Sequence, residues 1–144
     1  MFVWYLHHSL PVTPINPHSA SIDIPPDSRE LPFRPRLEPQ YPTAPSLSAL
    51  ATPQETAVSI ITPPKVTLQV LAEAKRVGIK AVWLQPGSFD MEGLKFARQE
   101  FQVAIGGFQG LPKTKGEEGW CILVDGEQGL SLFRRDGQAK GERL

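Results

Sequence analysis

The side-chain types that commonly perform catalysis occur in this chain, but not at the spacings that catalysis needs. His7, His8 and His18 all precede residue 19 and have no Asp or Glu near them at ligand spacing. Because tetrahedral zinc needs three or four converging ligands, surface or capping roles are the better interpretation of these histidines. Asp90 and Glu92 fall in the first turn of an expected helix, where carboxylates favour the helix dipole. The sequence therefore predicts no catalytic constellation and no metal site.

The single cysteine and one pair of glycines are equally weak candidates for chemistry. Cys121 lies in the apolar run 120–125, which favours a buried, inert thiol over a reactive one. Gly106 and Gly107 are not a phosphate-binding fingerprint, because no helical pattern begins directly after them.

Four short turns that contain Pro or Gly remain as candidates for ligand contacts. In open α/β sheets a ligand lies beyond the carboxyl ends of the strands, and such turns let the backbone approach a flat ligand closely. A site of this kind works through shape and main-chain groups instead of reactive side chains. The four turns are Asn16-Pro17, Thr62-Pro63-Pro64, Gln85-Pro86-Gly87 and Gly106-Gly107.

Strand–helix–strand units of about 25 residues must position these turns, which predicts parallel pairing with right-handed crossovers. The fold class is therefore α/β, an open parallel sheet with helices on both faces. The expected strands are 56–62, 80–85, 102–105 and 120–125, and the expected helices are 65–77 and 89–100.

Capping signals mark the ends of both helices. Thr62 suits the N-cap of the first helix with Pro63 at its first position, and Gly78 can adopt the left-handed conformation that ends it. Ser88 or Asp90 is expected near the start of the second helix. Ahead of these units, residues 2–8 are expected to be the last turns of a helix and 10–17 to be extended.

Proline is concentrated in the first half of the chain. Seven of the fifteen prolines fall within residues 23–46, so this segment cannot sustain a helix and has too little apolar surface to offset its ordering entropy. We expect an exposed insertion, polyproline-II-rich or disordered, inside a domain over 1–132 that is followed by a polar, frayed tail over 133–144. Residues 34–39 could also be a ligand for an aromatic-lined groove, although a solvated loop is the better interpretation.

Charge and hydropathy exclude several classes of partner. Fifteen Lys and Arg balance fifteen Asp and Glu, which leaves no electrostatic signature for nucleic acid or an acidic membrane. No apolar run approaches the ~20 residues of a membrane helix, and the N-terminus lacks the features of a signal or transit peptide. The sequence predicts a cytoplasmic protein with no nucleic-acid or membrane partner.

Four motifs together resemble the CoA-binding domain family, the small stand-alone Rossmann-like proteins similar to the CoA-binding domain of the succinyl-CoA synthetase α subunit. The resemblance covers residues 1–22 and 45–130, and it implies a Rossmann-like fold with a small-molecule nucleotide ligand, CoA, and no metal. The motifs are 12–17, 59–64, 81–87 and 120–121, of which Val82-Trp83-Leu84-Gln85-Pro86-Gly87 is the most specific. The cofactor-binding residues implied by the resemblance are Asn16, Pro17, Thr62, Pro63, Pro64, Gln85 and Gly87.

The chain departs from the family pattern at its start. Family members begin with a strand and a Gly-containing phosphate loop, whereas this chain begins inside the expected first helix and has no Gly before Gly78. We therefore expect an N-terminally truncated member whose first strand and phosphate loop are missing. Because that strand is central in the order 3-2-1-4-5, its loss predicts two separated groups of strands with unpaired edges.

The sequence thus predicts a CoA or adenine-nucleotide binding module without catalysis of its own. Two alternatives stay open: an impaired truncated remnant that binds ligand poorly, and an interaction protein acting through its Pro-rich segment. An enzyme is the least favoured class, because there is no length for a phosphohistidine-bearing companion domain and no dinucleotide fingerprint.

Overall fold

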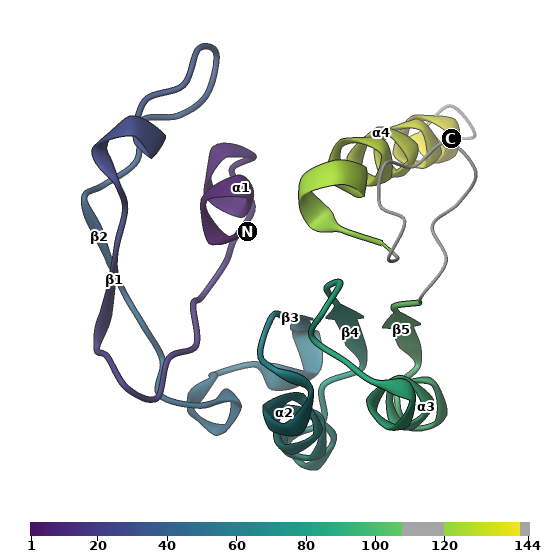
Figure 1. Cartoon of the computed structure of the whole chain (residues 1–144). Coiled ribbons are helices and arrows are strands. Elements are labelled where there is room, and N and C mark those ends of the chain that lie inside the picture. The colour runs from purple at the N-terminus through teal and green to yellow at the C-terminus, as the bar shows by residue number, and fades with distance from the viewer. Residues whose placement is uncertain (108–119, 142–144) are drawn as a thin grey trace.

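Three short strands, rich in apolar and β-branched residues, form a parallel sheet (Figure 1). The structure is a computed structural model of the whole chain that describes residues 1–107 and 120–141, with side chains described for 1–107 and 120–131. The strands are β3 (Ala57–Ile60), β4 (Ala81–Leu84) and β5 (Val103–Ile105), paired in the order β3-β4-β5. The expected strands at 56–62, 80–85 and 102–105 are confirmed, and each is slightly shorter than expected.

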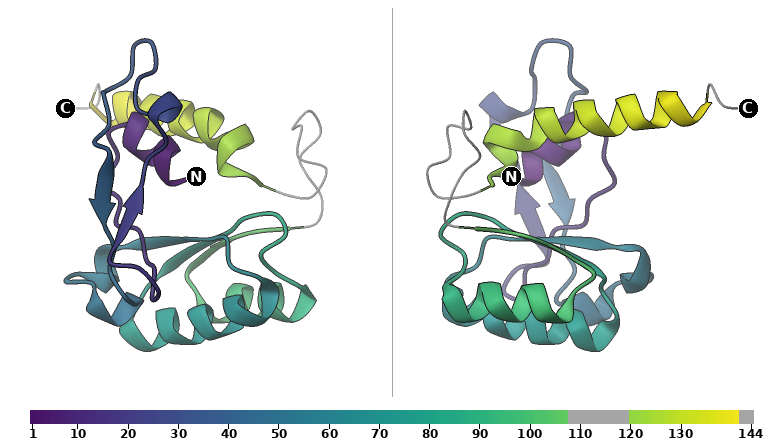
Figure 2. Two further views of the ribbon diagram at one scale, coloured as in Figure 1. Left: turned by 60° about the vertical axis from the view of Figure 1, so that its left-hand side comes forward. Right: turned by 90° about the vertical axis from the view of Figure 1, so that its right-hand side faces the viewer.

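The described α-helices lie in two layers, one on each side of this sheet (Figure 2). α2 and α3 cover one face, and α1 and α4 lie on the other side. The helices are α1 (Phe2–His7), α2 (Pro64–Val77), α3 (Met91–Glu100) and α4 (Ile122–Gly141). The prediction of a Rossmann-like α/β fold with a parallel sheet and helices on both faces is therefore confirmed.

The helix ends follow the expected signals, with one shift. Gly78 ends α2 in the left-handed conformation, at φ 87°, as glycine allows without a Cβ clash. The N-terminal capping positions of α2 lie one residue later than expected, with Pro63 in place of Thr62 as N-cap and Pro64 at the first helical position. Asp90 caps α3, because its carboxylate accepts a 2.8 Å hydrogen bond from the Gly93 N–H.

The main core lies between the sheet and the α2–α3 layer. Alternate strand residues point into it, as the two-residue period of a strand requires: Val82 and Leu84 are buried, whereas Trp83 between them is half-buried on the other face. Leu71 and Ala74 of α2 meet these strand residues at helical spacing. The other buried members of this core are Leu47, Ile60, Ile79, Phe89, Leu94, Ala97 and Phe101.

The Pro-rich segment 23–46 is not polyproline-II or disordered throughout, and that interpretation was wrong. β1 (Ser21–Asp23) and β2 (Gln40–Pro42) form an antiparallel pair, and Ile24 and Leu37, in the residues that connect them, are buried. α1 packs against this part of the chain, since the Phe2 ring contacts Tyr41 edge-on at 5.5 Å and His7 Nε2 donates to the Ser28 carbonyl. Most residues between the two strands are exposed, as expected.

The run 120–125, which was expected to be a final strand, is the start of a helix. α4 begins at Ile122 and continues to Gly141, so the prediction of a frayed tail after residue 132 is also wrong up to that residue. A short apolar run does not distinguish a strand from a buried helical turn. Here Ile122 and Asp125 are both buried, which is the i, i+3 spacing of one helix face.

The expected separation of two strand groups is present in the described residues. The extended segment 10–17 makes a single parallel bridge, Ile15 to Ala44, and this bridge stands apart from the β3-β4-β5 sheet. A side-chain hydrogen bond between Tyr5 of α1 and Ser59 of β3 links the two parts. Three 3₁₀ turns complete the connections: η1 (Pro26–Ser28), η2 (Leu47–Ala49) and η3 (Pro53–Glu55).

Candidate functional site

The turn that follows β4 exposes backbone at the carboxyl edge of the sheet. The Ser88 N–H and hydroxyl both donate to the Gln85 carbonyl, at 3.0 and 2.7 Å. Pro86 precedes Gly87, which has φ 82°, and this is the arrangement of a type II turn. Of the part of the chain that the structure describes, nothing lies within 4 Å of a Cβ built at Gly87. The backbone at Gly87 is therefore open to a flat ligand.

The turn that follows β3 is organised by a wholly buried hydroxyl. Thr67, which is 0% exposed, donates from Oγ1 to the Thr62 carbonyl at 3.0 Å. The 2.8 Å bond between the two hydroxyls must then have Thr62 as its donor. Thr62 is half-buried as a residue, and its hydroxyl, already a donor to Thr67, can offer a ligand only a hydrogen-bond acceptor.

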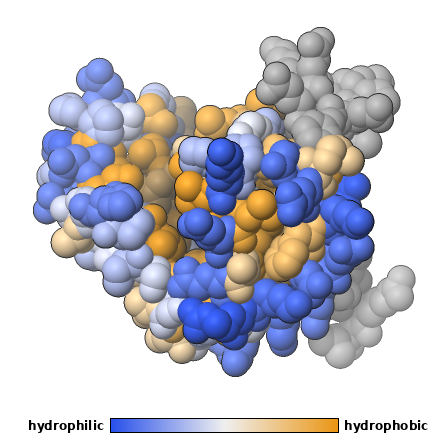
Figure 3. All heavy atoms as spheres, turned by 60° about the horizontal axis from the view of Figure 1, so that its bottom comes forward, coloured by the Kyte–Doolittle hydropathy of each residue, from blue (hydrophilic) through white to orange (hydrophobic). Residues whose placement is uncertain are grey.

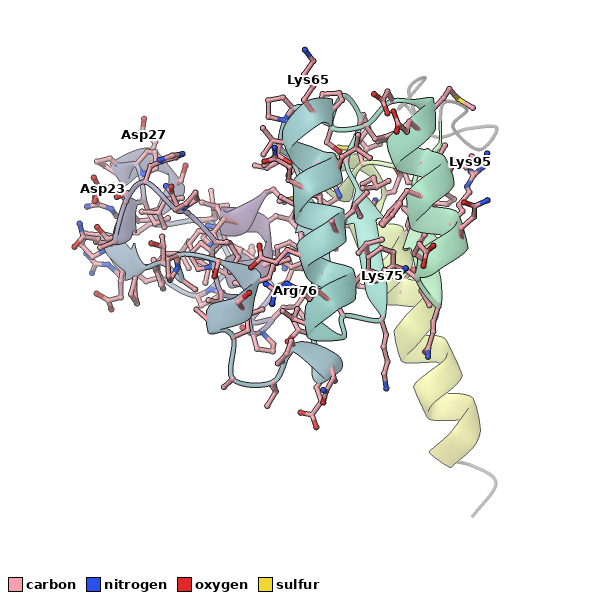
Figure 4. The ribbon with its side chains drawn as sticks, turned by 90° about the horizontal axis from the view of Figure 1, so that it is seen from below. Asp23, Asp27, Lys65, Lys75, Arg76 and Lys95 are labelled. Carbon is pink, nitrogen blue, oxygen red and sulfur yellow. The ribbon has the colours of Figure 1, made fainter. Side chains whose placement is uncertain are left out.

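The N-terminus of α2 is a poor cradle for phosphate. Pro63 and Pro64 have no N–H, and the N–H groups of Val66 and Thr67 both donate to the Pro63 carbonyl at 2.9 Å. A phosphate-binding helix N-terminus needs several free N–H groups, and this one keeps only that of Lys65. The Lys65 side chain projects beyond the end of α2 (Figure 4), so its ammonium is the cation available at this turn.

The two turns lie next to each other. The Gln85 N–H donates to the Ile60 carbonyl at 3.0 Å and so extends the β3–β4 ladder by one bond. Because parallel strands end at the same edge, this bond places Thr62-Pro63-Pro64 beside Gln85-Pro86-Gly87. The structure therefore brings together five of the seven residues that the family resemblance implies.

Gln85 has one side-chain atom without a partner. The residue is 5% exposed, and its Oε1 accepts from the Ile122 N–H at 2.9 Å. Its Nε2 is buried and has no hydrogen-bond partner within residues 1–107 and 120–131. Since the Ile122 group is a donor, Oε1 must face it and the unpaired atom must be the amino group. A buried donor left unpaired costs about 1–3 kcal/mol, so an acceptor from a ligand would be stabilised here.

Asn16 and Pro17 are placed elsewhere. Asn16 Oδ1 accepts from the His18 N–H at 2.9 Å, and the Asn16 N–H donates to the Ala44 carbonyl at 2.9 Å. These residues belong to the segment between α1 and β1 (Figure 1). This segment lies beside the hairpin that β1 and β2 form with the residues between them. Among the described residues no hydrogen bond or ring contact joins them to the two strand-end turns.

The fourth expected turn has a packing role in the described residues. A Cβ at Gly106 would lie 3.2 Å from both Leu84 Cβ and Leu94 Cδ1, so glycine lets the end of β5 approach the core closely. The Gly106 carbonyl accepts from Arg98 at 3.1 Å. Residues 108–119, which follow, lie outside the described part of the chain.

Ile122, which bonds to Gln85, was not among the expected site residues, whereas Trp83 and Trp120 were expected only as parts of family motifs. Trp83 Nε1 donates to the Trp120 carbonyl at 3.0 Å, and Ile122 bonds to Gln85. Both contacts form because the chain enters a helix at Ile122. The strand that we expected over 120–125 did not predict them. Asp125 was the available signal, because its carboxylate accepts from the Cys121 N–H at 2.9 Å and closes the first helical turn.

Two open surface grooves lie away from these turns. One, of about 590 Å³, is on the hairpin between Pro26 and Pro39. The other, of about 560 Å³, lies on α3 and is lined mainly by apolar atoms of Met91, Leu94 and the stems of Lys95 and Arg98. Figure 3, which brings the side of α2 and α3 forward, shows hydrophobic residues in its middle with hydrophilic residues around them. Neither groove is lined by residues of the two strand-end turns. The candidate site is therefore the pair of turns and not a groove.

Within 1–107 and 120–131 no group of three or more His, Cys, Asp or Glu side chains is placed to hold a metal ion. In the same part of the chain no helix combines the length and hydropathy that crossing a bilayer requires.

An open parallel sheet with helices on both faces and Pro- and Gly-containing turns at its carboxyl edge defines a Rossmann-like binding domain. The family model described as "CoA binding domain" matches residues 1–109 of the chain. The chain therefore belongs to the CoA-binding domain family, and the resemblance seen in the sequence is confirmed. No curated protein and no solved structure matches the chain significantly.

Proposed function

We propose that this chain binds CoA or a closely related adenine nucleotide at the carboxyl edge of β3 and β4, as a binding module and not as an enzyme. The observation that supports this most directly is the adjacency of the turns Thr62–Pro64 and Gln85–Gly87, joined through the Gln85 to Ile60 backbone bond. These turns fall within the residues that match the family.

The chemistry of the turns favours the flat, weakly polar part of a nucleotide. Pro63 and Gly87 are exposed and offer a ring face and bare backbone, on which an adenine ring can pack closely. Thr62 offers a hydroxyl acceptor, which suits the exocyclic amine of adenine.

The same site is weak for the pyrophosphate. The Pro63-Pro64 start of α2 leaves one free N–H, and Lys65 is the cation that α2 contributes at this end. We therefore expect binding that depends on the adenine more than on the phosphates, and an affinity below that of a site with a full phosphate loop.

The proposal is tested by isothermal titration with CoA on the full chain. CoA should bind and raise the melting temperature by mass action. Lys65→Ala should weaken binding roughly threefold, because a single exposed charge contact contributes under about 1 kcal/mol. Lys95→Ala is the matched control on the outer face of α3 and should bind like the original chain. If millimolar CoA gives neither heat nor a melting shift in a cooperatively folded protein, the proposal is wrong.

An interaction role is a second candidate, and the tip of the hairpin favours it. Phe33 is fully exposed, at 105% of its reference area, and holds a left-handed φ of 59°, a strained backbone for a bulky residue. Leu37 is buried, so residues 34–39 do not present their leucine to a partner groove. A photo-cross-linking residue at position 33 should give a discrete adduct in cells, whereas the same residue at exposed Gln40 should not.

A further inference from the structure

The first turn of α4 is built directly on the end of β4. The Trp83 indole N–H donates to the Trp120 carbonyl at 3.0 Å, and the Ile122 N–H donates to Gln85 Oε1 at 2.9 Å. The first N–H groups of a helix have no partner inside the helix, so Gln85 acts as a cap for α4. Gln85, a residue of the candidate site, is therefore also the residue to which the start of α4 is bonded.

α1 holds the next turn of α4 from the other side. A Cβ at Gly126 would lie 2.5 Å from Trp4 Cζ2, so the indole packs on bare helix backbone. Trp4 stacks on the His8 ring at 3.9 Å, and His8 Nε2 lies 2.5 Å from Glu127. The start of α4 is therefore clamped between β4 and α1.

This clamp seals the unpaired amino group of Gln85. Nε2 is buried and has no hydrogen-bond partner among the described residues, and the same side-chain amide is held through Oε1 by the first turn of α4. We infer that the first turn of α4 is an autoinhibitory cover over Gln85, and that CoA gains its hydrogen bond to Nε2 only when this turn moves away. The inference rests on the function proposed above.

The contacts that hold the cover are few enough for such a movement. Those in the described residues are two hydrogen bonds at its start, the buried Ile122 side chain and the Gly126–Trp4 packing. The ion pairs to an exposed Glu127 contribute little. Gly126 and Gly129 also lower the helix propensity of α4. The apparent affinity of a covered site is its intrinsic affinity multiplied by the fraction of molecules in which the site is open. Loosening the cover should therefore tighten CoA binding.

A matched pair of glycine variants tests the cover. Gly126→Ala places a methyl group against Trp4 and should loosen α4, whereas a Cβ at Gly129 meets no described atom within 4 Å. We expect Gly126→Ala to tighten CoA binding roughly fivefold, a typical coupling between two sites. Gly129→Ala should leave binding unchanged or slightly weaker. Ile122→Pro is a second release variant, because it removes the N–H that bonds to Gln85 while proline is tolerated at a first helical position.

Hydrogen exchange of α4 amides and tryptophan fluorescence report the cover independently of ligand. The chain has three tryptophans, and Trp4, Trp83 and Trp120 all lie at this junction. The expected result is faster exchange in residues 122–131 of the release variants together with tighter CoA binding.

Two results would contradict the proposals separately. If hydrogen exchange shows that α4 is released in the variants but their CoA affinity equals that of the original chain, the cover is wrong. The proposed function then still holds. Absence of CoA binding by the folded original chain at millimolar CoA overturns the proposed function itself, because a cover that weakens binding about fivefold would leave it detectable.

Discussion

At the scale of single residues, the strand-end turns depend on groups that are buried or conformationally special. Thr67 has no exposed surface and joins its hydroxyl to both the carbonyl and the hydroxyl of Thr62. Gly78 and Gly87 both hold positive φ values, 87° and 82°, but only Gly78 faces a close neighbour, Gln54 Cγ at 3.1 Å from a built Cβ. Both features predict measurable losses of stability.

We expect Thr67→Val to lower the free energy of unfolding by about 1–2 kcal/mol, because the Thr62 carbonyl loses a buried donor. Urea denaturation measures this change. Thr56→Val is the control, since its hydroxyl bonds to the Thr52 carbonyl at an exposed position, and it should change stability by less than about 0.5 kcal/mol. Equal losses in both variants would show that the Thr62 turn does not depend on Thr67.

We expect Gly87→Ala to cost about 1 kcal/mol, the price of a left-handed backbone for a residue with a Cβ. Gly78→Ala should cost more, because its Cβ also crowds Gln54. The difference between the two unfolding free energies isolates the steric part. A Gly78→Ala variant as stable as Gly87→Ala would contradict the close contact.

At the scale of elements, the hairpin shows how a proline-rich segment becomes ordered. Ile24 is 2% and Leu37 5% exposed, the Leu37 N–H donates to the Arg29 carbonyl at 2.9 Å, and α1 covers the pair of strands. The segment is held by these few apolar anchors and by tertiary contacts, while its prolines occupy positions that need no N–H donor.

Leu37→Ala should therefore destabilise the protein by about 2–4 kcal/mol, as expected for a truncated buried leucine. Leu31→Ala, at a residue 46% exposed on the same hairpin, should change stability by less than about 0.5 kcal/mol. Urea unfolding of the two variants separates an anchored hairpin from a solvated loop, because a solvated loop would respond weakly to both.

At the scale of the whole molecule, three distant segments meet at one carboxylate. Glu127 of α4 contacts His8 beside α1 and Arg34 of the hairpin, the latter at 3.0 Å. The His8 hydrogen bond, with smaller contributions from the charges of His8 and Arg34, holds the pKa of Glu127 below its ordinary value. Because the side chain is 63% exposed, solvent screening keeps the associated stability small.

The lowered pKa has a definite consequence for stability against pH. A carboxyl group with a depressed pKa in the folded state stabilises the fold above its unfolded pKa, and this contribution is lost as the pH falls through the folded pKa. Glu127→Gln should therefore be less stable than the original chain at neutral pH, by under about 0.5 kcal/mol. The difference should vanish in acid. A difference that is constant from neutral to acid pH would contradict this ion-pair role.

Much of the sheet could be predicted from the sequence because its signals are local. A hydrophobic period of two or 3.6 residues, and a glycine such as Gly78 that ends a helix, can be recognised within a short stretch of sequence. The elements predicted in this way agree with β3, α2, β4, α3 and β5. The turns at Thr62 and Gln85 follow directly, since parallel strands must end at one edge.

Tertiary structure alone decided the remaining features. The run at Ile122 is helical because Gln85 caps it and Trp4 packs on Gly126, and both partners are remote in sequence. The hairpin is ordered because α1 covers it, and Asn16 lies beside Ala44 instead of at the strand-end turns. Long-range burial and capping outweigh local propensity wherever an element has no strong period of its own.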